Sequence, residues 1–187
     1  MIIRLAECHL QPWKNGLGRT REIAVQPSNA GTDDFLWRVS IAEVDSAAPF
    51  SSFPGVDRQI VLLDGNGFTM TLDDDRVHPL TTPLVPFGFA GESKVAVTLT
   101  DGPTRDFNLM VRRAQARGEV LIWREAGARI PDPSTILIYC ASGVIDTTEG
   151  SLRAGDTWRR SSPSTTAPVT LHDGAMALAI RIEQRQG

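Results

Sequence analysis

Short runs of apolar and β-branched residues recur along the whole chain, separated by Gly, Pro, Asp and Ser. The apolar spacing of an amphipathic helix is not found in any window of a dozen residues, so the pattern does not predict helices. Runs of this length between turn residues are typical of β-strands. We therefore predict an all-β protein, with strands at residues 2–5, 22–25, 37–44, 59–63, 68–72, 84–87, 95–100, 107–112, 119–123, 135–139, 143–147, 157–160, 169–172 and 176–183.

Two turns and an internal similarity suggest how these strands are organised. The segments 64–67 (DGNG) and 148–150 (TEG) are typical of hairpin turns, which require positive φ. Residues 59–65 are echoed by residues 135–143, and each segment is followed by a turn and a late β run. An internal repeat of this kind predicts two barrel or jelly-roll units. We place the N-terminal unit, with its added N-terminal strands, at residues 1–125 and the C-terminal unit, which can share strands with it, at residues 126–187.

Composition and charge exclude several classes of partner. The chain has 187 residues, 22% of them charged, and a net charge of −3. Nucleic acids and anionic membranes do not attract such a protein at long range, so we expect neither as a partner. The N-terminal apolar stretch ends after three residues, which is too short for a signal peptide. We therefore expect a cytoplasmic protein in which Cys8 and Cys140 are reduced thiols.

The usual catalytic and metal motifs are missing from the sequence. His9, His78 and His172 do not form an H-x-H or H-E-x-x-H pair, and neither cysteine belongs to a C-x-x-C motif. The acidic run Asp73–Asp75 lacks the spacing of a calcium loop, and we interpret it as a solvated hairpin tip. The G-x-S-x-G elbow and the G-x-G-x-x-G fingerprint are absent as well. The sequence thus predicts no bound metal and no cofactor.

Two predicted strands, 37–44 and 107–112, each combine an apolar face with a mixed face. Alternation assigns a guanidinium, a small polar group and an apolar side chain to each mixed face: Arg38, Ser40, Ala42, Asn108, Met110 and Arg112. Such a face can meet solvent. Alternatively it can point into the mouth of a barrel, where an arginine would bind a carboxylate through two parallel hydrogen bonds. The residues alone leave both interpretations open.

Four motifs, in order across residues 12–113, resemble the HutD/Ves family. They are PWKNGLGRTREIA (12–24), FLWRVSIAEV (35–44), PFSSFPG (49–55) with Arg58, and DGPTRDFNLMVRR (101–113). The resemblance implies a bicupin fold, with two cupin-type β-barrels in one chain. Members called HutD accompany bacterial histidine-utilisation genes and are thought to restrain that pathway by sensing an intermediate. The resemblance therefore implies a sensor or binder more than a metal-dependent cupin enzyme.

The pathway intermediates formylglutamate, urocanate and formiminoglutamate are all carboxylates, so we expect a small carboxylate ligand in the first barrel. Arg58 and Arg38 are our candidates for the carboxylate, with Asn108 and Ser40 as orienting hydrogen-bond partners. The remaining candidates are Lys14, as a further positive charge from its loop, and Phe53 and Trp37, as apolar walls. Alternation places Trp37 on the face opposite Arg38.

Two other functions compete with this hypothesis. A metal-free isomerase or lyase acting on a small acid would use Glu43, Asp106 or His78 as its general acid or base. An interaction protein would instead pair through the exposed edge strands of its sheets. Antiparallel sheets of this kind often associate, so we also expect a homodimer.

Overall fold

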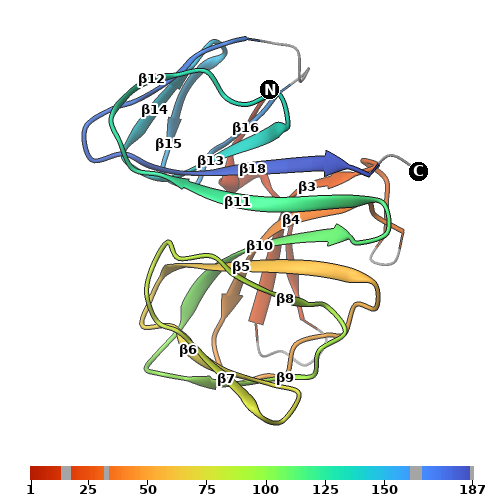
Figure 1. The fold of residues 1–187 in the computed structure, drawn as a ribbon. Coiled ribbons are helices and arrows are strands. Elements are labelled where there is room, and N and C mark those ends of the chain that lie inside the picture. The colour runs from red at the N-terminus through yellow and green to blue at the C-terminus, as the bar shows by residue number, and fades with distance from the viewer. Residues whose placement is uncertain (14–17, 32–33, 161–165, 186–187) are drawn as a thin grey trace. The chain divides into compact units, whose positions relative to one another are not determined.

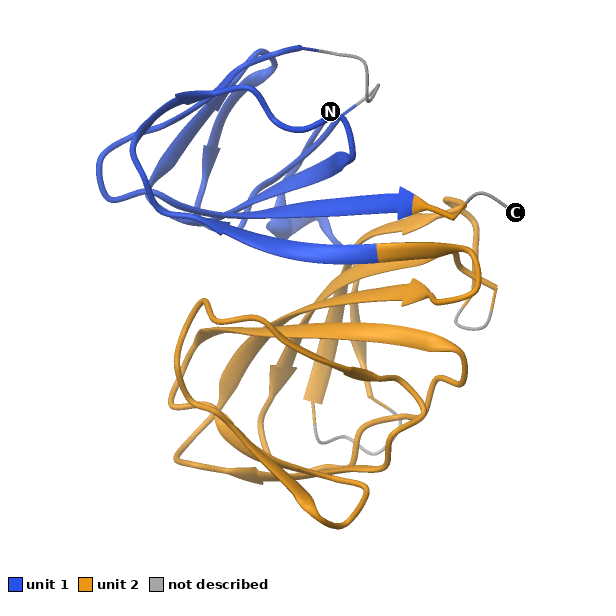
Figure 2. Cartoon of the chain, viewed as in Figure 1, with its two compact units in different colours: residues 1–8, 118–183 blue, residues 9–117, 184–187 orange. Residues whose placement is uncertain are grey.

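The computed structural model describes residues 1–13, 18–31, 34–160 and 166–185 (Figure 1). These residues form two compact units (Figure 2), which we call unit 1 (residues 1–8 and 118–183) and unit 2 (residues 9–117 and 184–187). The chain thus divides differently from the sequence-based boundary between residues 125 and 126. The N-terminus belongs to unit 1 because β1 (Ile2–Ile3) pairs antiparallel with β16 (Thr157–Arg159).

Unit 2 consists of two antiparallel sheets, with strand orders β2-β3-β4-β10-β5-β8 and β7-β6-β9. Its strands are β2 (Leu10–Pro12), β3 (Gly18–Gln26), β4 (Trp37–Val44), β5 (Val56–Asp64), β6 (Phe68–Leu72), β7 (Arg76–Leu80), β8 (Phe87–Ala90), β9 (Val95–Leu99) and β10 (Thr104–Arg112). One buried cluster joins residues of both sheets, among them Val44, Ile60, Leu62, Met70 and Val97. Because these side chains come from facing strands, the two sheets enclose a shared apolar core.

Unit 1 also has two sheets, with strand orders β1-β16-β13-β18-β11 and β12-β17-β14-β15. Besides β1, β16 and the short 3-10 helix η1 (Leu5–Glu7), its elements are β11 (Ala116–Trp123), β12 (Gly127–Arg129), β13 (Thr135–Ser142), β14 (Val144–Thr147), β15 (Gly150–Arg153), β17 (Val169–Leu171) and β18 (Met176–Gln184). The first two residues of β11 and the last residue of β18 fall in unit 2. The core of unit 1 includes Ile138, Trp158 and Leu171.

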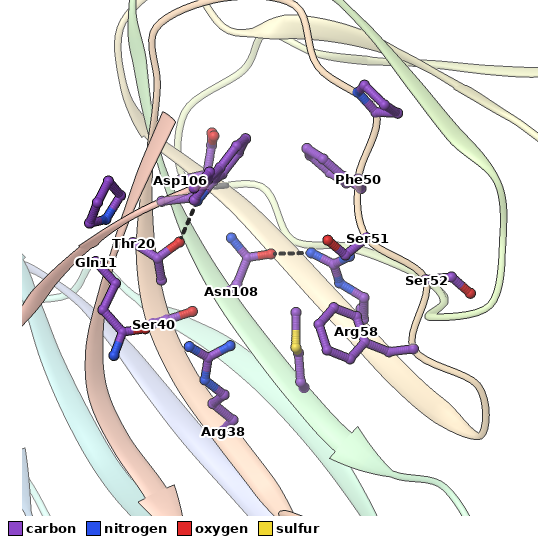
Figure 3. Close-up of a pocket in the computed structure, with 16 residues that line it drawn as sticks. Gln11, Thr20, Arg38, Ser40, Phe50, Ser51, Ser52, Arg58, Asp106 and Asn108 are labelled. Atoms are coloured by element: carbon purple, nitrogen blue, oxygen red, sulfur yellow. Dashed lines mark hydrogen bonds between the residues drawn. The ribbon is translucent and has the colours of Figure 1, made fainter. Parts of the chain in front are cut away.

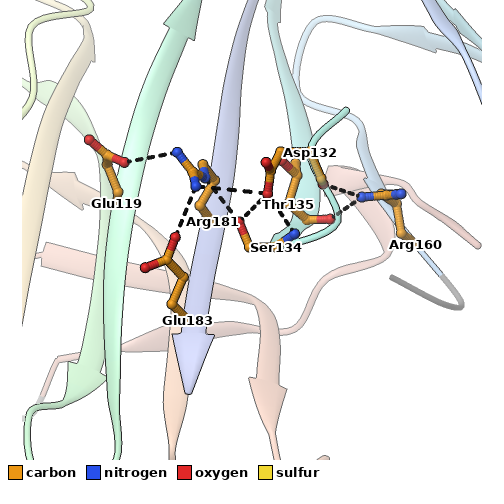
Figure 4. Close-up of polar contacts among 7 residues, drawn as sticks. All are labelled: Glu119, Asp132, Ser134, Thr135, Arg160, Arg181 and Glu183. Atoms are coloured by element: carbon orange, nitrogen blue, oxygen red, sulfur yellow. Dashed lines mark hydrogen bonds and ion pairs between the residues drawn. The ribbon is translucent and has the colours of Figure 1, made fainter. Parts of the chain in front are cut away.

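Two arginines fix the segment that leads from β12 into β13 (Figure 4). Arg160 Nη1 donates hydrogen bonds of 2.7 Å to the carbonyl oxygens of Asp132 and Thr135. Arg181 Nε, on β18, donates to Ser134 Oγ at 2.9 Å, and Ser134 in turn donates its backbone N–H to Asp132 Oδ1 at 2.8 Å. The backbone N–H of Thr135 also donates to the Asp132 carbonyl at 2.9 Å, so side chains and one backbone turn together hold this connection where it enters β13.

Most of the predicted strands are confirmed, and those at 37–44 and 68–72 match β4 and β6 at both ends. The strand predicted at 84–87 is wrong: Leu84 has a φ of 57°, outside the extended region, and β8 begins only at Phe87. Four short strands were not predicted, namely β2, β7, β12 and β15. They have three to five residues each, which is too short for a clear alternation.

The two predicted turns have different outcomes. Residues 148–150 do join a hairpin, in which β14 pairs with β15. Gly65 and Gly67 have the expected positive φ values of 88° and 73°, but β5 and β6 lie in different sheets and do not pair. The turn therefore carries the chain from one sheet to the other. A Cβ at Gly65 would lie 2.5 Å from the Pro103 carbonyl oxygen, so this corner leaves no room for a side chain.

The all-β prediction is confirmed. The internal repeat stays a prediction. Gly65 and Gly143 do occupy similar places: both have positive φ, Gly65 between β5 and β6 and Gly143 between β13 and β14, where the chain passes from the larger to the smaller sheet of its unit. Within the described part of the chain, no helix has the length and apolarity needed to cross a membrane.

Candidate functional site

A cavity of about 510 Å³ opens in unit 2, at the polar end of the same face that forms the core (Figure 3). Three neighbouring strands supply its floor. Because β10 pairs with β4 on one side and with β5 on the other, Met110 lies opposite both Arg38 and Arg58. One pleat along, Asn108 lies opposite Ser40. The mixed faces of two predicted strands therefore point into the cavity, which decides between the alternatives that the sequence left open.

Arg58, on β5, is the most buried cation among the described residues of the site, with 6% of its surface exposed. Its Nη2 donates a hydrogen bond of 3.0 Å to Asn108 Oδ1, as Figure 3 shows. Its Nε is buried and lacks a hydrogen-bond partner among the described residues. Burial, together with the nearby positive charge of Arg38, lowers the pKa of Arg58 to about 10. The guanidinium therefore stays charged at neutral pH, within a setting that stabilises the charge poorly.

Three aromatic rings surround this guanidinium. The Cζ atom of Arg58 lies 4.9 Å from the ring centroid of Phe89, 5.1 Å from that of Phe50 and 5.8 Å from that of Phe53. Cation–π contacts of this kind partly offset the loss of water and limit the movement of the side chain.

Arg38, on β4, is electrostatically different from Arg58. Its Nε donates to Glu22 Oε2 at 2.7 Å, which makes a part-buried ion pair. For Arg58, no carboxylate lies within ion-pair distance in the described part of the chain. The cavity therefore contains one neutralised guanidinium and one whose charge is not balanced by a described residue.

Asp106 also lines the cavity, on the same face of β10 as Asn108. Its side chain is fully buried, and Thr104 Oγ1 donates to its Oδ1 at 3.1 Å. Burial raises the pKa of Asp106 to about 7; the hydrogen bond from Thr104 opposes this effect and the charge of Asp64 adds to it. At neutral pH the group is divided between a neutral acid that donates a hydrogen bond and a carboxylate that accepts one.

The remaining walls come from the N-terminal strands and from the segment 49–53. The indole Nε1 of Trp13 donates to Thr20 Oγ1 at 2.8 Å, so that the ring is held at the cavity wall. Phe50, Ser51 and Ser52 line the other side. Their segment is held by backbone hydrogen bonds from Phe50 N to Val95 O at 3.1 Å and from Phe53 N to Gly91 O at 2.7 Å.

Five of the seven candidate ligand-binding residues line this cavity: Arg38, Ser40, Phe53, Arg58 and Asn108. Lys14 lies outside the described residues. Trp37 is not among the lining residues and is buried, so its prediction as an apolar wall is wrong. The cause is strand alternation, which turns Trp37 away from the face that carries Arg38.

Of the three candidate acid–base residues, only Asp106 lines the cavity. Glu43 forms ion pairs with Arg19 at 3.2 Å and Arg21 at 3.5 Å. His78 stacks on Phe87 with the ring centroids 3.6 Å apart, and burial, with a smaller effect of Arg76, lowers its pKa. Neither residue therefore belongs to this site.

Trp13, Thr20, Phe50, Ser51 and Ser52 were not individual candidates for ligand binding, although the family motifs at 12–24 and 49–55 contain all five. The motifs were thus the signal that could have identified them. Within the described residues, His, Cys, Asp and Glu do not gather in groups of three or more that could hold a metal ion.

Comparison with known proteins assigns the chain to a family. The chain is 37% identical over 146 residues to an uncharacterised 21.2 kDa protein from the hutC 3′ region of Pseudomonas putida. The aligned region covers 78% of this chain and 75% of that relative. It is 37% identical over 153 residues to protein Ves of Citrobacter koseri, with 77% and 70% covered.

Solved structures agree with these relatives. The structure of HutD from Pseudomonas fluorescens SBW25 matches with a TM-score of 0.86 and 30% identity, covering 100% of this chain and 99% of the other. An oxalate decarboxylase structure matches with a TM-score of 0.66 at 9% identity, covering 100% of this chain and 78% of the other. This is a likeness of fold alone, and it confirms the predicted cupin-type fold. The HutD family model matches residues 5–178, and this protein therefore belongs to the HutD family.

Proposed function

We propose that the protein binds a small organic acid in the cavity of unit 2, with the ligand carboxylate on Arg58. The proposal includes a sensor role, in which the bound acid is an intermediate of histidine degradation and its binding restrains histidine utilisation. Formylglutamate, urocanate and formiminoglutamate are the candidate ligands. Family membership, with a relative from the hutC 3′ region, supports the connection to histidine utilisation.

The observation that carries this proposal is the charge on Arg58. A guanidinium buried without a counter-ion costs several kcal/mol of solvation energy, which is rarely retained without a role. Asn108 and three aromatic rings fix its orientation, and its Nε still lacks a partner among the described residues. A ligand carboxylate would supply both the missing charge and the missing acceptor, through charge-assisted hydrogen bonds.

Isothermal titration with the three acids at millimolar concentration tests the proposal. We expect at least one acid to bind, and Arg58→Gln to weaken its affinity by about tenfold or more. Arg105→Gln is the matched control, because Arg105 lies on β10 and pairs with Asp64 at the surface. Near-UV circular dichroism of Arg58→Gln, and of Arg58→Lys, which keeps the positive charge, separates a loss of binding from a loss of fold. The absence of binding by all three acids, or equal affinities for the wild type and a folded Arg58→Gln variant, would contradict the proposal.

A second candidate is a metal-free isomerase or lyase, and the specific observation in its favour is Asp106. A carboxyl group with a pKa near 7 that lines a cavity suits general acid–base catalysis. Turnover of one of the three acids by the wild type, and its loss in Asp106→Asn, would support the enzyme. Binding without turnover favours the sensor. The homodimer stays a prediction, which sedimentation velocity tests.

A further inference from the structure

One polar atom of the cavity is not explained by carboxylate binding at Arg58. Asp106 is fully buried, and its Oδ1 accepts a hydrogen bond from Thr104. Its Oδ2 is also buried and has no hydrogen-bond partner in the described part of the chain. A buried polar atom in this state costs desolvation energy and is uncommon in folded proteins. The orphaned oxygen therefore points to a missing partner.

The position of Asp106 relative to Arg58 follows from the strand register. Residues two apart on one strand lie about 7 Å apart on the same face. Asn108 contacts Arg58, and Asp106 is the next residue on that face of β10. Asp106 lies opposite Ala42 and Leu62, both of which belong to the apolar core, so it lies at the end of the cavity next to that core. A ligand several bonds long that is anchored at Arg58 can therefore extend to Asp106.

Resting on the proposed function, we propose that Asp106 is a specificity-determining residue that hydrogen-bonds a nitrogen or hydroxyl group at the end of the ligand away from its carboxylate. The preferred ligands are then acids with a hydrogen-bonding group at each end and an apolar or planar middle part. Trp13, Phe50 and Met110 supply the walls that such a middle part would contact.

The chemistry of Asp106 suits this role in either protonation state. As the neutral acid it donates to a ring nitrogen, a carbonyl or a hydroxyl group, and as a carboxylate it accepts from an N–H or O–H group. A hydrocarbon end offers none of these groups and would leave Oδ2 without a partner. A site built to bind a polar group discriminates strongly against the analogue that lacks it.

Two probes of similar shape test the inference. Urocanate and cinnamate are both planar acrylates with one carboxylate, but only urocanate has ring nitrogens at its far end. We would titrate both into the wild type, Asp106→Ala and Asp106→Leu, of which the last restores the lost volume. Asp101→Ala, at an exposed aspartate outside the cavity, is the matched control. The ratio of the two affinities isolates the contribution of the far end, because effects on the fold or on Arg58 act on both probes.

We expect the wild type and Asp101→Ala to prefer urocanate by about tenfold or more, and the preference to fall to less than about threefold in both Asp106 variants. An unchanged ratio in the Asp106 variants, with Arg58-dependent binding intact, would overturn the inference and leave the proposed function standing. Binding of neither probe nor any of the other acids would overturn both. A bound water that satisfies Oδ2 and stays in place would give the unchanged ratio, and so counts against the inference.

Discussion

Arg58 Nη2 and Asn108 Oδ1 lie 3.0 Å apart, in a buried hydrogen bond between neighbouring strands of one sheet. The amide accepts from the guanidinium without neutralising it. Asn108 therefore holds Arg58 in place and leaves its charge available, as a site for an anionic ligand requires.

Replacing this amide by a carboxylate should block the site. In Asn108→Asp the new side chain has the same shape and forms an ion pair with Arg58, which competes with the ligand. We expect acid affinity to fall by about tenfold or more in calorimetric titration. Asn66→Asp is the control for the added charge, since Asn66 lies in an exposed turn outside the cavity. An affinity for Asn108→Asp equal to that of the control would show that the charge on Arg58 does not attract the ligand.

The raised pKa of Asp106 predicts a pH dependence of stability. Between about pH 4 and pH 7 the unfolded chain releases this proton, whereas the folded protein, with its pKa at about 7, retains it. This group therefore lowers the free energy of unfolding as the pH rises through that window, and has no further effect above it.

Asp106→Asn removes this titration and provides the test. In urea unfolding from pH 4.5 to pH 8, we expect the variant to gain stability relative to the wild type as the pH rises, and the gain to level off above about pH 7. The difference in the free energy of unfolding between Asp106→Asn and the wild type should change with pH by at most about 1.4 kcal/mol per pH unit. A difference that is independent of pH would mean that Asp106 has an ordinary pKa in the folded protein.

The aromatic ring of Phe89 should stabilise the buried charge of Arg58. Phe89 lies opposite Arg58 in the β5–β8 pairing, with its ring centroid 4.9 Å from Cζ. Phe89→Leu keeps an apolar side chain but removes the π face, so we expect a loss of about 1–2 kcal/mol in the free energy of unfolding. Repeating the measurement in the Arg58→Met background isolates the pair. If Phe89→Leu costs the same in both backgrounds, the ring contributes by packing alone.

In unit 1, Arg160 is predicted to be important for stability rather than binding. Its Nη1 satisfies two carbonyl oxygens of the segment that leads into β13. Arg160→Met should lower the free energy of unfolding by about 1–3 kcal/mol, because both carbonyls lose the guanidinium donor and the Asp132 carbonyl keeps only the backbone N–H of Thr135. Arg153→Met, at an exposed arginine on β15, serves as the reference and should change stability little. Equal free energies of unfolding of the two variants, measured by urea denaturation, would contradict this role.

Local patterns predicted the strands that matter most for the site. Alternation alone placed Arg38, Ser40, Asn108 and Met110 on one side of two strands, and the structure brings these four residues together. The same rule already set Trp37 on the opposite side, so its assignment as a wall contradicted the best local signal. Arg58 and Phe53 were identified through the composition of the turn-rich segment 49–58 and through the family motif there, and not through periodicity.

Other features depend on contacts that a local pattern does not encode. The pairing of β1 with β16 joins residues 2–3 to residues 157–158, and it moves the N-terminus into unit 1. The positive φ of Leu84 delays β8, although the apolar sequence there favours an extended strand. Asp106 was predicted only as a general acid or base, because its burial against Ala42 and Leu62 results from the register of three strands.

A crystal structure of the protein with the acid that binds most tightly tests the binding site most directly. We predict a carboxylate whose oxygen accepts a hydrogen bond from Arg58 Nε at about 2.8 Å, with the Arg58–Asn108 hydrogen bond retained. Density for the acid outside this cavity, or a water molecule on Arg58 Nε while the acid is bound elsewhere, would contradict the site.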